Sequence, residues 1–171
     1  MKIMRITTVA AVLAAVSLTF SAFAQGKPAY AAAAKPGTST IKDIVVQPDG
    51  EFDVLQAALI TTGLVGAFEG KDQYTVFAPT DAAFVSTLGV ADKAAAIDYL
   101  NGLPVDALTY ILLYHVTEGR RTSRSVLAAP EYEMLNGEYL TRDELAAAGI
   151  AATDISASNG IIHVINHVLI P

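Results

Sequence analysis

Apolar and polar positions in the first half of the chain predict a series of short helices. Ser39 or Thr40 can cap a short helix that starts at residue 41. Residues 51–62 carry apolar side chains at helical spacing, and Gly63 follows as a terminator. Further helices are expected over residues 92–100 and, after Pro104 in the first turn, up to residue 115.

A strand is expected between these helices, over residues 74–78, where β-favouring residues alternate. Pro79 has no backbone N–H to donate, so the strand should stop there. Thr80 then stands where a helix needs an N-cap, and Asp81 follows in the first turn. The sequence therefore predicts a strand that leads directly into a capped helix.

The pattern changes to short strands after Gly119. Strands are expected at residues 132–135 and 139–140, joined by a type I′ turn at Asn136-Gly137. Residues 141–144 form a Thr-x-x-Glu capping box, which predicts a short helix that ends at Gly149. A turn at residues 159–160 should lead into a last strand over residues 161–170. These elements indicate the α+β class with a small sheet sandwich.

The N-terminus has the order of a secretory signal peptide. Lys2 and Arg5 precede an apolar run over residues 6–20, and the small-residue pattern Ala-Phe-Ala ends at Ala24. The run is shorter than the ~20 residues that span a membrane as a helix, so we expect cleavage after Ala24 and no stable membrane insertion of the mature chain. Residues 25–38 read as a flexible linker, and residues 39–171 as one folded domain. The protein should then be periplasmic or extracellular.

Charge restricts the classes of partner. The chain has 11 basic and 17 acidic residues and a formal charge of −6, and the signal segment removes two of the basic residues. An acidic surface repels phosphate backbones, so nucleic acid is not expected as a partner. Arg120, Arg121 and Arg124 form a small basic cluster. The cluster is either a solvated loop or a contact for a sulfated or uronic polysaccharide.

Two distant segments and one dipeptide resemble the fasciclin (FAS1) domain family. The segment TVFAPTDAAF at residues 75–84 resembles its first signature box, NGIIHVINHVLIP at 159–171 its second, and Tyr114-His115 its Tyr-His motif. The resemblance implies two small β-sheets packed with helices, and a role in cell adhesion or matrix contact. The motif residues expected to hold this fold are Phe77, Pro79, Thr80, Phe84, His115, Gly160, His163 and Val164.

The resemblance also implies where a partner binds. Asp154-Ile155 falls where animal relatives carry a pair implicated in receptor binding. Together with Tyr114 and His115, this pair is expected to contact a surface or matrix protein or polysaccharide. The alternative function is a carrier of a lipophilic small molecule such as a carotenoid, which some family members hold. The apolar residues in 52–68 and 105–116 would then line a pocket, or they simply form the core.

Metal binding and catalysis have little support in the sequence. His163 and His167 have the spacing of two helical metal ligands, but an alternating strand would separate them by roughly 13 Å. His115 reads as a core histidine with a polar partner expected at Thr80 or Asp81. No nucleophile or phosphate-binding motif occurs. We therefore expect no enzyme activity, no metal and no cofactor, while the oligomeric state stays open.

Overall fold

The computed structural model describes residues 37–47, 50–70 and 72–171. The expected signal peptide and residues 25–36 of the expected linker lie outside these residues. The first half contains α2 (Ile41–Val45), α3 (Asp53–Thr62), the 3-10 helix η1 (Leu64–Phe68), β1 (Tyr74–Pro79), α4 (Asp81–Leu88), α5 (Lys93–Asn101) and α6 (Val105–Leu113). The second half contains β2 (Val116–Glu118), α7 (Ser123–Ala128), β3 (Glu131–Glu133), β4 (Tyr139–Thr141), α8 (Arg142–Ala148), β5 (Ile150–Ala157) and β6 (Gly160–Ile165).

Side-chain caps start several helices where the sequence predicts them. Thr40 and Asp43 form a capping box at α2, and Thr80 accepts a hydrogen bond from Ala83 N at α4. Thr141 and Glu144 form the predicted capping box at α8. Each cap satisfies backbone N–H groups that the first turn of a helix leaves unpaired. These local signals fix the helix starts in the order that the sequence predicts.

The main sheet brings the two distant motif segments together. Its strand order is β2-β1-β6-β5, and β3 and β4 form a second sheet of two strands. β1 and β6 run parallel, with Val76 opposite Ile162 and Phe77 opposite His163. Thr80 N also donates to Ile165 O at 3.4 Å. The expected α+β fold with two small sheets is confirmed, with the two boxes as its central strand pair.

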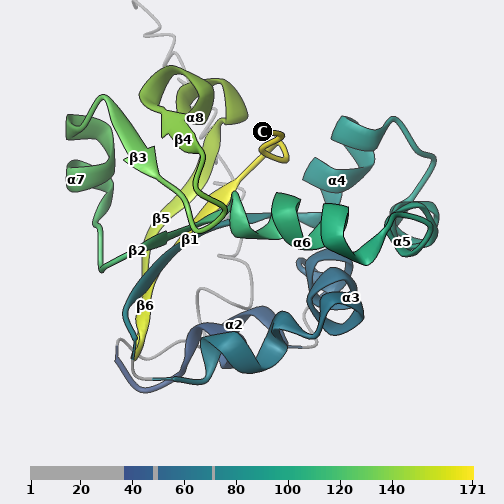
Figure 1. Cartoon of the computed structure of the whole chain (residues 1–171), viewed down its shortest axis with the longest axis horizontal. Coiled ribbons are helices and arrows are strands. Elements are labelled where there is room, and N and C mark those ends of the chain that lie inside the picture. Colours follow the sequence, from purple (N-terminus) through teal and green to yellow (C-terminus); the bar gives the residue numbers. More distant parts are fainter. Residues whose placement is uncertain (1–36, 48–49, 71) are drawn as a thin grey trace, which may run out of the picture.

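Each face of the central strands is buried in a different core. Figure 1 shows α3, α4, α5 and α6 on one side of the main sheet, and β3, β4, α7 and α8 on the other. Alternate residues such as Val76 and Ile162 pack in the first core. Phe77, which follows Val76, and Ile165, which follows the first-core residue Val164, pack in the second core. Burial on both faces is typical of parallel strands covered on two sides, and it explains the continuous apolar run in β6.

Both outer edges of the main sheet are obstructed. At β2, Leu135 N donates to Val116 O at 2.8 Å, and Thr117 Oγ1 donates to Glu133 O at 2.8 Å. At β5, the pairing with β6 shifts register twice between Ile150 and Ile155. Such bulges twist a strand and interrupt its row of free backbone groups.

Several details differ from the sequence predictions, which also contain neither β2 nor β5. The turn at Asn136-Gly137 is not type I′, because only Gly137 has a positive φ, of 88°. The last strand ends at Ile165 rather than Ile170, since Asn166 N donates to Gly149 O and the chain leaves the sheet. Helix α7 was not predicted. Its first N–H is satisfied by a side chain from far along the sequence, so the local sequence carries little signal for it.

Candidate functional site

Tyr114 and His115 lie at the end of α6 and are buried. Their exposed fractions are 4% and 3%. The Tyr114 hydroxyl donates to Tyr139 O at 3.3 Å. Neither side chain is therefore available to a partner on the surface of the folded domain, which does not fit the expectation that they contact one.

His115 links α6 to the C-terminal residues. Its Nδ1 lies 2.8 Å from Ile111 O, and its Nε2 lies 3.0 Å from Leu169 N. Since a backbone N–H can only donate, Nε2 accepts and Nδ1 carries the proton. Burial lowers the pKa of His115 to about 4, so the ring is neutral at pH 7. The expectation of a partner at Thr80 or Asp81 was wrong, because the partner is the Leu169 backbone.

Asp81 acts on a different helix from its own. Its Oδ1 accepts from Val54 N at 2.9 Å, so it caps α3, whose own N-cap Phe52 makes no side-chain cap. Its Oδ2 is buried and has no hydrogen-bond partner among the described residues, and the nearest cation is Lys93 Nζ at 3.9 Å. Desolvation raises the pKa of Asp81. The first signature box thus ties α3 to α4.

His163 holds the bulged part of β5. It is fully buried, its Nδ1 accepts from Asp154 N at 3.3 Å, and its Nε2 donates to Arg121 O at 3.0 Å. Burial lowers the pKa of His163, which keeps the ring neutral. His167 lies beyond the end of β6, so the two histidines do not share a strand as predicted. Within the described ranges, no group of three or more His, Cys, Asp or Glu residues could hold a metal ion.

Asp154 is exposed and fixes the start of α7. Its backbone has a φ of 59°, and it is the only non-glycine residue in the described part of the chain with a positive φ. Its carboxylate accepts hydrogen bonds from the backbone N and the hydroxyl of Ser123, the first residue of α7. Burial alone would raise the pKa of Asp154, but the bonds from Ser123 outweigh it and lower the pKa. Its neighbour Ile155 is half-buried against the first core.

The arginine cluster lies beside Asp154. Arg120 donates to Ala157 O at 2.8 Å and to the Ser156 hydroxyl, both on β5. Arg121 lies over the Tyr132 ring, with its Cζ 5.0 Å from the ring centroid. Arg124 follows Ser123 in α7 and is exposed.

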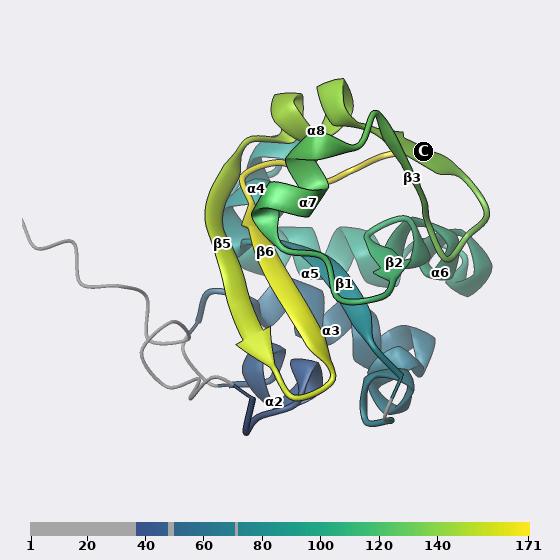
Figure 2. The same ribbon diagram turned by 90° about the vertical axis from the view of Figure 1, so that its left-hand side faces the viewer.

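We define the β5–α7 junction as the surface formed by Arg120, Arg121, Ser123, Arg124, Asp154 and Ser156. In Figure 2, α7 lies in front of β6, and Ser123 at its start is bonded to Asp154 of β5. The sequence predicted the arginines and Asp154 as separate candidates. The structure joins them through the bonds to Ser123 and Ser156. No local pattern could have linked these residues, because they belong to distant segments.

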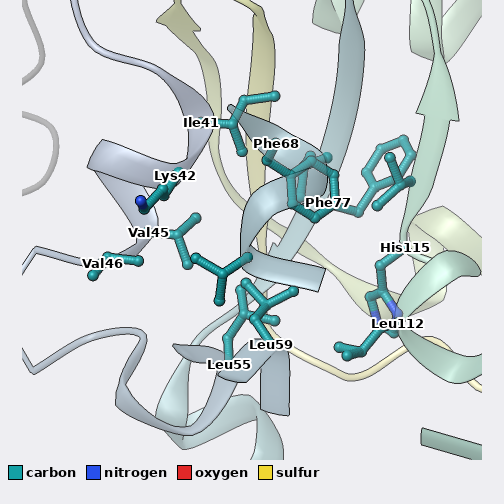
Figure 3. A pocket seen from close by; sticks show the side chains of 13 residues that line it. Ile41, Lys42, Val45, Val46, Leu55, Leu59, Phe68, Phe77, Leu112 and His115 are labelled. Carbon is teal, nitrogen blue, oxygen red and sulfur yellow. The ribbon is translucent and has the colours of Figure 1, made fainter. Parts of the chain in front are cut away.

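Two apolar cavities lie among the helices of the first core. The smaller, about 30 Å³, is enclosed by α2, α3, η1, β1 and α6. Figure 3 shows Lys42 and Val45 on one side of it, and His115 and Leu112 on the other. This volume suits about one water molecule. The larger cavity, about 240 Å³, lies between α4, α5, α6 and the C-terminal residues, and His115 lines it as well.

Comparison with known proteins places these features in a family. The family model "Fasciclin domain" matches residues 50–171. Protein sll1483 of Synechocystis is 37% identical over 128 residues, which cover 70% of this chain and 67% of that protein. Transforming growth factor-beta-induced protein ig-h3 of Sus scrofa is 33% identical over 80% of this chain and 20% of that protein. The cell surface glycolipoprotein MPB83 of Mycobacterium bovis is 35% identical over 63% of this chain and 48% of that protein.

The fold is also similar to a solved structure. A FAS1 domain pair from the insect cell adhesion molecule fasciclin I superposes with a TM-score of 0.56 at 15% identity. The match covers 78% of this chain and 51% of that one. The described helices of this chain include none long and apolar enough to cross a membrane. By its family model, its relatives and its fold, the chain belongs to the fasciclin domain family.

Proposed function

We propose that this chain is a non-enzymatic adhesion or interaction domain that binds a surface or matrix partner. A relative with 35% identity is named a cell surface glycolipoprotein, which supports a role at a surface. The motif residues support a structural rather than catalytic use. Tyr114, His115 and His163 are buried and bonded to backbone groups, so they hold the fold.

The observation that carries the proposal is the β5–α7 junction. It combines exposed Arg120 and Arg124 with the half-buried Arg121 on a chain that is otherwise acidic. Hydrogen bonds to β5 hold Arg120, so this part of the surface is preorganised. A guanidinium group pairs well with carboxylate and sulfate oxygens. An acidic polysaccharide, or a protein with an acidic patch, is the partner that this chemistry favours.

Binding to polysaccharides of different charge tests this assignment. Residues 25–171 should bind a sulfated and a uronic polysaccharide in co-sedimentation, and a neutral dextran not at all. Binding should weaken as salt rises, because exposed charges are screened beyond about 10 Å at 0.1 M. Arg124→Gln should weaken binding severalfold. Arg142→Gln, which removes an exposed arginine on α8, is the matched control and should bind like the unmodified chain.

Equal binding of neutral and acidic polysaccharides would contradict the proposed partner. Equal weakening of binding in Arg124→Gln and Arg142→Gln would contradict it as well. Binding to envelope proteins but to no polysaccharide would favour a protein partner instead.

Export through residues 1–24 forms part of the same proposal. The charged start, apolar run and small-residue site are the sequence features that support it. The mass of the protein recovered from periplasm and medium should match a chain that begins at Gln25. Recovery of the uncleaved chain in the membrane fraction would contradict the proposal.

A carrier of an apolar small molecule is the second candidate function. The cavity of about 240 Å³ favours it, because its lining is apolar apart from Thr87, Tyr99 and His115. This volume is below the roughly 300–1,000 Å³ of typical ligand sites. A molecule as long as a carotenoid would therefore need the cavity to enlarge.

A further inference from the structure

The C-terminal segment (Asn166–Pro171) follows β6 without regular structure, and it is held to three neighbours. Val168 N donates to Thr87 Oγ1 at 3.1 Å, on α4. Leu169 N donates to His115 Nε2 at 3.0 Å. His167 Nδ1 lies 3.3 Å from Ala148 O, at the end of α8. Asn166 N donates to Gly149 O at 2.9 Å, next to the end of α8. The segment therefore crosses between α4, α6 and α8.

This segment separates two hollow regions. The apolar cavity of about 240 Å³ lies on one side, and an open cleft of about 340 Å³ lies on the other. Thr87, Val168 and Ile170 line both. Ile170 is 64% exposed, whereas Leu169 is buried in the second core and Val168 packs half-buried against the first, so the burial of these two side chains also holds the segment. Movement of the segment would join the two regions into one chamber whose size is within the range of ligand sites.

We propose that the C-terminal segment is a movable wall of a binding chamber for a single-tailed amphiphile, and that the bond from Leu169 to His115 keeps this wall closed. The proposal rests on the second candidate function and is independent of polysaccharide binding at the β5–α7 junction. In this carrier the C-terminal segment acts as the gate, and the ligand is a single-tailed amphiphile.

The lining of the chamber selects the ligand. Residues around the apolar cavity carry no formal charge when His115 is neutral, which suits a hydrocarbon tail. The cleft adds Glu144 and His167 at the other end. Hydrogen bonds from Thr141 lower the pKa of Glu144, so its carboxylate is ionised and only accepts hydrogen bonds. The head group that fits this end is an uncharged hydrogen-bond donor, such as an alcohol.

Acid should release the wall because of how His115 is bonded. Its Nδ1 already donates to Ile111 O, so a second proton must go to Nε2, the atom that accepts from Leu169 N. Two N–H groups would then face each other. Among residues that line the cavities beside His115, α2 contributes Lys42, which is paired with Glu69, and α4 and α5 contribute only the uncharged Thr87 and Tyr99. None of these supplies a negative charge to stabilise the imidazolium at this position.

The first experiment opens the wall at neutral pH. The probe is N-phenyl-1-naphthylamine, an uncharged N–H donor whose fluorescence rises in apolar surroundings. Thr87→Val removes the acceptor for Val168 N and keeps the side-chain shape. The variant should bind the probe at least fivefold more tightly than the unmodified chain at pH 7. Ser86→Ala, an exposed position on the same helix, is the matched control and should not change binding.

The second experiment opens the wall with acid. If the open state titrates near 6.5, its population rises roughly twentyfold between pH 7 and pH 5. Probe binding and amide exchange of Leu169 should rise with it, while near-ultraviolet circular dichroism shows that the domain stays folded. His115→Gln keeps an acceptor for Leu169 N but does not titrate, so this variant should lose the acid response.

His163→Gln removes the other buried histidine, and this variant should keep the acid response. Decanol should displace the probe more effectively than decanoate, which Glu144 repels.

The possible outcomes distinguish failure of the movable C-terminal segment from failure of the carrier function. No probe binding by any variant at either pH would overturn both the chamber and the carrier function. Equal binding by the unmodified chain and Thr87→Val at both pH values would overturn the gate and leave the carrier standing. An acid response that persists in His115→Gln would overturn the role of His115.

Discussion

Phe77 and His163 are register partners of β1 and β6, and their rings stack with centroids 5.7 Å apart at an angle of 27°. One residue comes from each signature box. Both side chains are fully buried, and the His163 ring continues the contact outward to Asp154 and Arg121 through hydrogen bonds. The His163 ring therefore contacts the first signature box through Phe77 and the β5–α7 junction through Asp154 and Arg121.

Replacing His163 with alanine should destabilise the domain. The change removes the stacking contact and leaves two backbone groups without a partner, so the free energy of unfolding should fall by about 3 kcal/mol. Urea unfolding followed by circular dichroism measures this loss. His167→Ala changes an exposed histidine and should cost less than about 1 kcal/mol. Similar losses in the two variants would contradict the role assigned to His163.

Gly160 should not tolerate a side chain. A Cβ at this position would lie 2.0 Å from Tyr74 O and 2.8 Å from Ile41 Cδ1. Gly160→Ala should therefore push β6 away from β1 and lower the free energy of unfolding by about 3 kcal/mol or more. Gly66→Ala is the control, because in the described part of the chain no atom beyond its own chain neighbours lies within 4 Å of its added Cβ. A fully stable Gly160→Ala variant would contradict the close approach of the two strands.

His115 should make the stability of the domain depend on pH. Its pKa is about 4 when folded and near 6.5 when unfolded, so the unfolded chain binds the proton more readily between these values. The contribution of His115 is complete above pH 6.5 and is lost as pH falls towards 4, by at most about 3 kcal/mol. Urea unfolding at pH 7 and pH 4.5 should show a smaller decrease for His115→Gln than for the unmodified chain. An equal decrease would mean that other groups set the acid sensitivity.

Asp81 should matter as a hydrogen-bond acceptor rather than as a charge. Asp81→Ala removes the cap of α3 and should lower the free energy of unfolding by about 1–2 kcal/mol. Asp81→Asn keeps an acceptor for Val54 N and removes a buried charge whose pKa desolvation raises, so it should cost less. Thermal unfolding at pH 7 compares the two. Equal losses in the two variants would show that the lost carboxylate charge, which lies 3.9 Å from Lys93 Nζ, matters more than the acceptor for Val54 N.

The sequence predicts the elements whose signals are local. Thr40, Thr80 and the Thr141–Glu144 box start helices through side chains that act within one turn, so their positions follow from the sequence. The central strand pair followed from the resemblance of the two boxes. Features that depend on distant contacts were missed. At the start of helix α7, Ser123 N donates a hydrogen bond to the Asp154 carboxylate, and β6 ends where Asn166 N donates to Gly149 O.

The same limit applies to the candidate site. His115 was expected to meet the first box, but its partner is a backbone N–H near the C-terminus, which no side-chain pattern could indicate. Tyr114 looked like a contact residue, yet the β3–β4 hairpin covers it. Asp154 and the arginines were each noticed, but their proximity depends on the hydrogen bonds that Ser123 and Arg120 donate to β5. Spatial grouping of polar residues across distant segments is therefore the part that required coordinates.

The obstructed edges of the main sheet have a consequence for copies of the domain that meet at high local concentration. Crowded sheets with free margins tend to join strand to strand into fibres. Here a loop residue occupies one margin and two register shifts distort the other. Strand-to-strand joining between copies of this domain is therefore disfavoured at both edges of the sheet.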